Sequence, residues 1–233
     1  MEKYGDGEIM KIAVQTLASG LFGIAFFVVL LFWPAGTLNY WQAWVFIAVF
    51  LVSTLVPSIY LAVKDPAVLR RRMKAGPTAE TRTLQKLVIT ATIVAVVAVL
   101  VVSALDHRFG WSNVPTPVVV LGNILVAVGL VLAQLVVIQN SYAAATITVE
   151  ADQKVVSTGL YGLVRHPMYV GTLIMMIGTP LALDSYWGLL TIVLALPVLA
   201  VRIEDEEKML RQELDGYDDY MQKVHYRLVP GVW

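Results

Sequence analysis

The stretch Val155–Gly171, VVSTGLYGLVRHPMYVG, joins a polar, β-branched segment to a hydrophobic one through Arg165-His166-Pro167. Proline suits the first turn of a helix, because its missing N–H would have no intrahelical partner there and its φ is already helical. We therefore predict that a helix begins at or near Pro167, with His166 or a neighbour as its cap. A helix start combines unpaired N–H donors with the positive end of the dipole, which favours a carboxylate or phosphate.

The residues around this start bear on whether it binds a ligand. Free backbone N–H groups are expected at residues 168–171. Gly159 and Gly162 bracket Tyr161, and glycine allows the backbone to approach a ligand closely. The alternative is a capped transmembrane helix whose Arg165 faces lipid headgroups.

The composition indicates that the chain is solvated by a membrane. It has 233 residues, of which 58% are hydrophobic and 15% charged, unlike an ordinary soluble domain. The absence of cysteine excludes disulfides, thiolate metal ligands and a cysteine nucleophile. A formal net charge of zero gives no indication of a nucleic-acid partner.

Apolar runs of about 20 residues, the length that crosses a bilayer as helix, predict the fold class. We expect an all-α integral membrane protein of about six transmembrane helices and a single domain. The one candidate for an extended segment is Thr146–Val149. The predicted spans are Ile12–Trp33, Trp41–Val63, Leu87–Leu105, Val118–Ile138, Pro167–Leu183 and Tyr186–Val201.

Basic residues predict the orientation of these spans. Of the 17 Lys and Arg residues, Arg108 alone lies in the turns after spans one, three and five. The positive-inside rule therefore places both termini, and the basic loop Lys64–Lys86, in the cytoplasm of a multi-pass protein. Arg70-Arg71-Arg72 in that loop is interpreted as a topology anchor, with binding of anionic membrane lipids as the alternative.

A second group of charges lies where span six should leave the membrane. Arg202 and Glu206 are four residues apart and share one helix face. An intrahelical salt bridge is the simple explanation, yet Arg preceding Glu is the weaker order and contributes a few tenths of a kcal/mol. Because a charge at this depth is costly unless it is paired or faces a polar cavity, we expect the pair to have a function.

Metal chemistry and nucleotide-binding loops find no support in the sequence. His107 should lie across the membrane from His166 and His225, so no three-ligand metal cluster is expected. Glycine-rich phosphate loops of the dinucleotide or P-loop type do not occur.

Four motifs occur in order from about Asn140 to the C-terminus: Val156-x-Thr158-Gly159-x-Tyr161, Arg165-His166-Pro167-x-Tyr169-x-Gly171, Arg202-x-x-x-Glu206-Glu207-x-x-Leu210 and Tyr217-x-x-Tyr220. Together they resemble the isoprenylcysteine carboxyl methyltransferase family of membrane enzymes. The resemblance implies S-adenosylmethionine as cofactor at the cytosolic face and a lipophilic substrate that enters from the bilayer. Residues 1–139 would then be N-terminal transmembrane helices, and residues 140–233 the cofactor-binding region with the last two spans.

The resemblance also implies roles for individual residues. Arg202 would hold the substrate, and Glu207 is the nearest candidate base for an acceptor that must lose a proton. Gln153 stands where prenylcysteine enzymes tend to have histidine. The implied cofactor contacts are Gln153, Lys154, Val155, Val156, Tyr161, His166, Pro167, Met168, Tyr169 and Glu206.

The acceptor class stays open between alternatives. A carboxylate needs no general base, and Arg202 could orient it through a bidentate contact. Phospholipid N-methylation and thiol S-methylation are alternatives within the same fold. A more distant alternative is a sterol-reductase-like enzyme that binds NADPH, although such enzymes tend to have an Asp-rich tail that this chain lacks.

Overall fold

The computed structural model describes residues 6–64, 82–143 and 153–233, together with Val68, Gly76, Thr78 and Glu80. Within these residues the regular structure is helical, which confirms the predicted all-α class. The Thr146–Val149 and Arg70-Arg71-Arg72 segments lie outside the described residues. The elements are α1 (Asp6–Ala35), α2 (Trp41–Lys64), α4 (Thr83–Phe109), α5 (Thr116–Gln139), η1 (Gly159–Gly162), α6 (Pro167–Ala182), α7 (Trp187–Glu213) and α8 (Tyr217–Lys223).

The six predicted spans correspond to the six long helices. Five of them are long and apolar enough to cross a membrane, whereas α6 has 16 residues and is shorter. At a rise of 1.5 Å per residue α6 is roughly 24 Å long, less than the hydrocarbon core of about 30 Å. Helix α7 continues without a break from its apolar half into the charged sequence that ends at Glu213, as predicted.

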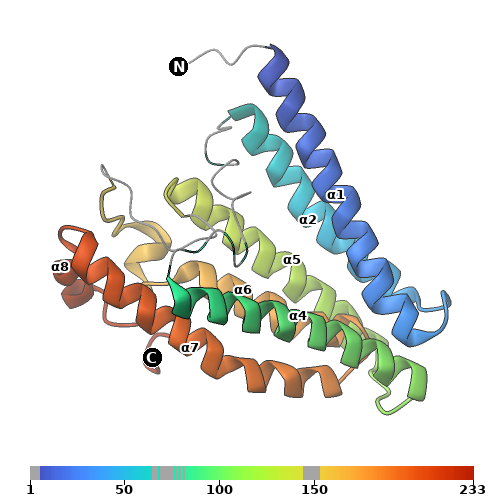
Figure 1. The fold of residues 1–233 in the computed structure, drawn as a ribbon. Helices are drawn as coiled ribbons and strands as arrows, with labels where there is room; N and C mark the ends of the chain where they lie inside the picture. Colours follow the sequence, from blue (N-terminus) through green and yellow to red (C-terminus); the bar gives the residue numbers. More distant parts are fainter. Residues whose placement is uncertain are drawn as a thin grey trace.

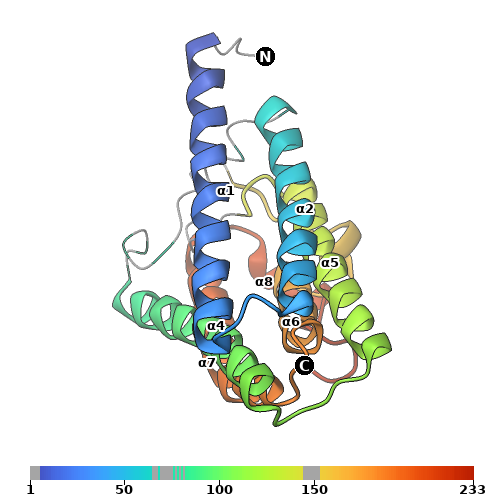
Figure 2. The ribbon, with the colours of Figure 1, turned by 90° about the vertical axis from the view of Figure 1, so that its right-hand side faces the viewer.

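The helices converge at one end of the molecule and diverge at the other (Figures 1 and 2). Helices α1 and α2 run side by side and lean away from α4, α6 and α7, while α5 packs along α6. The turns that follow α1, α4 and α6 meet at the closed end. The start of α1 and the end of α7 lie toward the open end, where α8 covers the end of α7.

Glycine permits the close contact between α5 and α6. Gly122 and Gly129 on α5, and Gly171 and Gly178 on α6, are spaced seven residues apart and face one another. A Cβ at Gly178 would lie 2.6 Å from the Gly122 carbonyl oxygen, and one at Gly171 would lie 2.7 Å from the Gly129 carbonyl oxygen. Small residues let transmembrane backbones approach in this way, so the position of the α6 start is fixed by α5.

A polar network closes the opposite end of the helices. The fully buried carboxylate of Asp106 accepts hydrogen bonds from the Ser112 and Ser185 hydroxyls, at 2.7 and 2.6 Å. Asp184 accepts from the Gln42 side chain at 3.0 Å. These bonds join α2, α4 and the turns before α5 and α7, so the helices are held together at that end.

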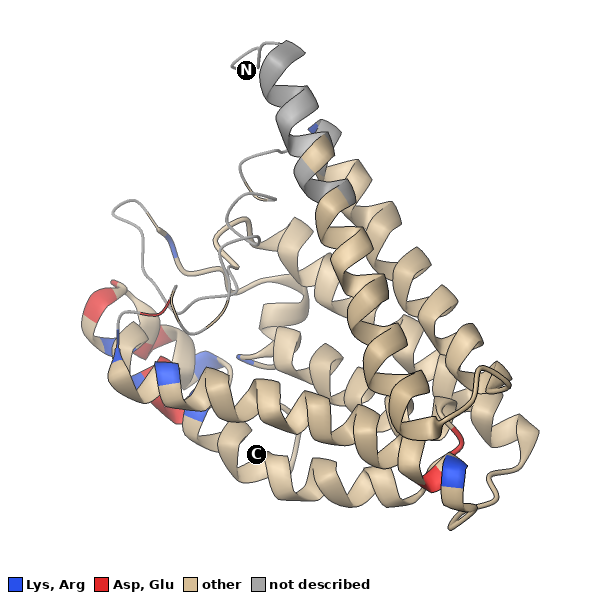
Figure 3. Ribbon diagram, turned by 45° about the vertical axis from the view of Figure 1, so that its right-hand side comes forward, with Lys and Arg blue, Asp and Glu red and all other residues tan. Residues whose placement is uncertain are grey.

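Charged side chains gather at the two ends of the helices (Figure 3). The larger group covers the end of α7, α8 and the start of α4, and a small group lies where α4 ends. The length between them is free of charge over the described residues. This distribution is that of a protein whose middle section faces lipid.

Candidate functional site

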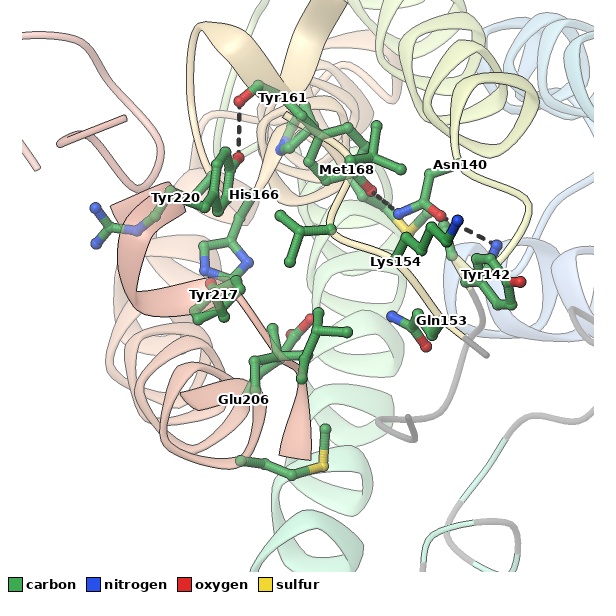
Figure 4. A pocket seen from close by; sticks show the side chains of 18 of the residues that line it. Asn140, Tyr142, Gln153, Lys154, Tyr161, His166, Met168, Glu206, Tyr217 and Tyr220 are labelled. Carbon is green, nitrogen blue, oxygen red and sulfur yellow. Dashed lines mark hydrogen bonds between the residues drawn. The ribbon is translucent and has the colours of Figure 1, made fainter. Parts of the chain in front are cut away.

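A pocket opens at the charged end of the molecule, between the C-terminus of α5, the start of α6, the end of α7 and α8. It encloses about 840 Å³ of empty space, part of which is open to solvent. Every site residue predicted from the sequence lines this pocket except Glu207. Figure 4 shows side chains from the chain stretch at Gln153 and Lys154 facing Glu206 of α7 across it.

Helix α6 begins at Pro167, as predicted, with His166 in the N-cap position. The prediction of free N–H groups along its first turn is wrong in part, because the Tyr169 and Val170 N–H groups both donate to the His166 carbonyl oxygen. The His166 side chain does not cap the helix; its Nε2 is instead 3.1 Å from a Glu207 carboxylate oxygen. The first turn is therefore tight and offers a ligand fewer backbone donors than expected.

The hydroxyl of Tyr169 links the two charged residues that the sequence placed on one face of α7. It accepts a hydrogen bond from Arg202 Nε at 2.9 Å and donates one to Glu206 Oε2 at 2.6 Å. Tyr169 thus bridges Arg202 and Glu206 from α6. The expected functional pair is part of a three-residue cluster on the pocket wall.

The other side of Arg202 is occupied by residues that the sequence analysis did not identify. Its Nη1 lies 3.3 Å from Glu80 Oε1 and donates to Gln85 Oε1 at 2.8 Å, and Nη2 lies 3.4 Å from Glu80 Oε1. Gln85 in turn donates to Asp205. Arg202 and Glu80 are 8% and 4% exposed, so this is a buried ion pair.

Three tyrosines of the pocket were quoted as motif residues, but their contacts were not foreseen. Tyr220 donates to the Tyr161 carbonyl oxygen at 2.7 Å, and the Tyr161 hydroxyl accepts from Asn140 at 3.2 Å. The hydroxyl of Tyr217 is buried and finds no hydrogen-bond partner among the described residues. Burial, followed by the nearby carboxylates of Glu207 and Glu206, raises the pKa of Tyr217, so the hydroxyl stays neutral.

Gly159, one of the two glycines that bracket Tyr161, has a role in the local packing of the chain. Gly159 has a φ of +58°, a conformation that glycine adopts without strain, and a Cβ there would overlap the Gln139 side chain. Gln139 donates to the Thr158 carbonyl oxygen at 3.0 Å and accepts from the Leu160 N–H at 3.1 Å. Gly159 therefore lets the end of α5 hold η1 in place.

Arg165 lines the pocket, Glu207 lies behind its wall, and the two side chains pair with each other. Arg165 is 7% exposed and donates to Glu207 Oε1 at 2.7 Å. The alternative considered for Arg165, a side chain that faces lipid headgroups, is thus excluded. Over the described residues, no three His, Asp or Glu side chains gather into a metal-ligand set.

Comparison with known proteins gives two results that agree with this site. A family model described as phospholipid methyltransferase matches residues 117–215, from the start of α5 to just beyond α7. Two rice proteins, from Oryza sativa subsp. indica and subsp. japonica, are each 34% identical to the chain over 109 residues. Each is named a probable protein-S-isoprenylcysteine O-methyltransferase.

The matches cover part of each protein. The rice alignments include 45% of this chain and 57% of each relative, so the chain spans little more than half the length of the relatives that it matches. The matched segment, less than half of this chain, is thus similar to membrane methyltransferases, in agreement with the helical fold and the pocket. Within that class the matches support the family predicted from the motifs, the isoprenylcysteine carboxyl methyltransferases.

Proposed function

We propose that the protein is a membrane-embedded methyltransferase that uses S-adenosylmethionine and acts on a lipophilic substrate from the bilayer. The observation that carries the proposal is the pocket itself. Residues from the chain around residue 153, η1, the start of α6 and α7 converge there, and the family resemblance assigns these residues to the cofactor. The names of the matched family and relatives support methyl transfer as the reaction class.

The lining of the pocket fits the parts of that cofactor. The half-buried Glu206 carboxylate can accept hydrogen bonds from ribose hydroxyls or an amino group. Lys154, which is exposed and lines the pocket, offers a positive charge to the methionine carboxylate. Val156 and Leu210 provide apolar surface for an adenine ring, and the unpaired Tyr217 hydroxyl is a further candidate contact.

S-adenosylmethionine, when bound, supplies an already activated methyl group. The residues of this chain are therefore left to align the two reactants and to exclude water, and alignment alone can lower a barrier by about 7–11 kcal/mol. Tyr169 serves this purpose because it fixes Arg202 and Glu206 relative to each other.

The contacts of Arg202 bear on the acceptor. A substrate carboxylate, the acceptor first expected from the resemblance, would have to displace Glu80 from the guanidinium. A lipid amine leaves the Arg202–Glu80 pair intact, and this observation favours phospholipid N-methylation as the second candidate function. Loss of the amine proton would then fall to Glu206, which lines the pocket, instead of Glu207, which does not.

Two measurements test the proposal. Isothermal titration with S-adenosylhomocysteine should show binding and titration with NADPH none; the reverse result would favour a sterol-reductase-like enzyme. Methyl transfer from labelled cofactor is then measured with farnesylcysteine analogues, phosphatidylethanolamine and small thiols. Transfer to the farnesylcysteine analogues that is lost in Arg202→Ala supports the carboxylate acceptor. Transfer to phosphatidylethanolamine alone, undiminished in Arg202→Ala, would overturn it and leave methyl transfer standing.

The open end of the molecule is proposed to face the cytoplasm, with both termini on that side. Arg108 is the one Lys or Arg in the three turns of the closed end. The positive-inside rule therefore assigns the pocket to the side on which a water-soluble cofactor is made.

A further inference from the structure

The carboxylate of Glu207 is enclosed by nitrogen atoms of three side chains. Its Oε1 accepts from Arg165 Nε at 2.7 Å and lies 3.1 Å from His166 Nε2, and its Oε2 accepts from Arg227 Nε at 2.9 Å. Glu207 is 3% exposed and is absent from the pocket lining. A carboxylate bonded to two guanidinium groups is a poor proton acceptor for a substrate, which argues against the role of general base.

The segment that follows α8 forms hydrogen bonds with Arg165 and His166. The backbone N–H groups of Arg165 and His166 donate to the carbonyl oxygens of Tyr226 and Arg227, at 2.9 and 3.0 Å. The Arg165 guanidinium donates to two further carbonyl oxygens of this segment, at 2.9 and 2.7 Å. Residues 224–227 therefore run beside the Arg165-His166 dipeptide and fix its backbone.

His166 and Arg165 are the members of this cluster that line the pocket, and His166 presents an aromatic ring to it. The His166 ring is 5% exposed and lines the pocket (Figure 4). It is tilted against the Tyr169 ring, with the two ring centroids 5.7 Å apart. A carboxylate bonded to one ring nitrogen places the proton on that nitrogen and sets the ring orientation. In the neutral ring, a proton on Nε2 leaves Nδ1 as a hydrogen-bond acceptor.

We propose that Glu207 is a positioning residue, which acts with Arg227 of the C-terminal segment to fix the tautomer and orientation of His166 in the pocket. The bonds to Arg165 and Arg227 hold the Glu207 carboxylate against the His166 ring. The ring therefore presents the same nitrogen, Nδ1, to a ligand in the pocket. The proposal rests on the proposed function in taking S-adenosylmethionine as that ligand. It assigns a role in the site to residues that do not touch the ligand.

The test combines ligand binding with a direct observation of the ring. Glu207→Gln and Arg227→Gln are compared with Glu204→Gln, a control that removes an exposed carboxylate from the same helix. Affinity for S-adenosylhomocysteine should fall about 10-fold in Glu207→Gln, as expected for loss of a charge-assisted hydrogen bond, and about 3-fold in Arg227→Gln. Glu204→Gln should bind as the wild type does.

Nitrogen NMR of histidine-labelled protein reports which ring nitrogen carries the proton. The protein has three histidines, and the His166 signals are assigned from a His166→Asn variant. A protonated Nε2 in the wild type, with a mixture of tautomers in Glu207→Gln, is the expected result. A structural role alone would lower the melting temperature without this change.

Unchanged affinity together with an unchanged tautomer in Arg227→Gln and Glu207→Gln would overturn the proposal. If Glu207→Gln does not fold, the Arg227→Gln variant tests the proposal instead. Arg227 is partly exposed, and its replacement removes only one of the three partners of the Glu207 carboxylate. A wild-type protein that binds no S-adenosylhomocysteine would refute the proposed function. The tautomer of His166 would still test the positioning role by itself.

Discussion

Replacement of Tyr169 by phenylalanine removes one oxygen atom from the centre of the site. The ring, which packs against His166, stays in place, so an effect must come from the hydroxyl. That hydroxyl bonds a guanidinium at 2.9 Å and a carboxylate at 2.6 Å. Hydrogen bonds to charged groups contribute about 1.5–3 kcal/mol each, but the two share one oxygen and one network, so their sum overstates the loss. We expect Tyr169→Phe to lower the free energy of unfolding by about 2–4 kcal/mol.

The same change should weaken cofactor binding, because Glu206 loses the donor that orients it. An affinity for S-adenosylhomocysteine that falls about 10-fold corresponds to 1.4 kcal/mol. Calorimetric titration measures the affinity, and thermal unfolding measures stability. Tyr186→Phe is the matched control, since Tyr186 is 43% exposed at the closed end of the molecule. If Tyr169→Phe loses stability but binds with wild-type affinity, the cluster serves the fold and not the cofactor, and our reasoning is refuted.

Four further predictions test other parts of the molecule. Arg202→Lys should restore less than half of the methyl transfer lost in Arg202→Ala, because lysine lacks the planar fork that reaches Glu80 and Tyr169 together; initial rates with labelled cofactor measure this. Tyr217→Phe should reduce S-adenosylhomocysteine affinity in titration while the melting temperature stays the same or rises, because an unpaired buried hydroxyl costs about 1–3 kcal/mol. Gly129→Ala should destabilise by about 1–3 kcal/mol in thermal unfolding through overpacking against α6, whereas Gly23→Ala, with open space around it, should not. A cysteine at the exposed Asn113 should react with an impermeant maleimide from outside the cell, and labelling from inside alone would contradict the topology.

The elements of the fold were predictable because hydropathy and proline act locally. Continuous apolar runs mark the six long helices, and the α6 start coincides with the predicted Pro167. The contact between α5 and α6 also has a signal in the sequence, the seven-residue spacing of the glycines on each helix. That signal carries information because a bilayer gives helices little reason to associate other than close packing.

The partners of Arg202 had no such signal. Glu80 and Gln85 lie more than a hundred residues away in sequence, and an acidic residue in a basic loop is indistinguishable from a solvated one. The different positions of Glu206 and Glu207 relative to the pocket also had no signal in the sequence. Adjacent helical residues point about 100° apart, so one carboxylate enters the pocket and the other faces Arg165. The motif contains both glutamates but does not indicate which of them lies on the helix face directed at the pocket.

The two ends of the molecule differ in what their polar groups do, and this difference locates the site. At the closed end both carboxylate oxygens of the buried Asp106 accept hydrogen bonds from hydroxyl and backbone donors of neighbouring turns, so this carboxylate serves the fold. At the open end α6 is short because its first turn forms a wall of the pocket instead of extending to the membrane surface. Arg202 and Glu206 lie one helical turn apart on α7, at this open end. Under the proposed function, an acceptor need not leave the bilayer: its chain stays between the diverging helices while its polar end meets a cofactor that enters from water.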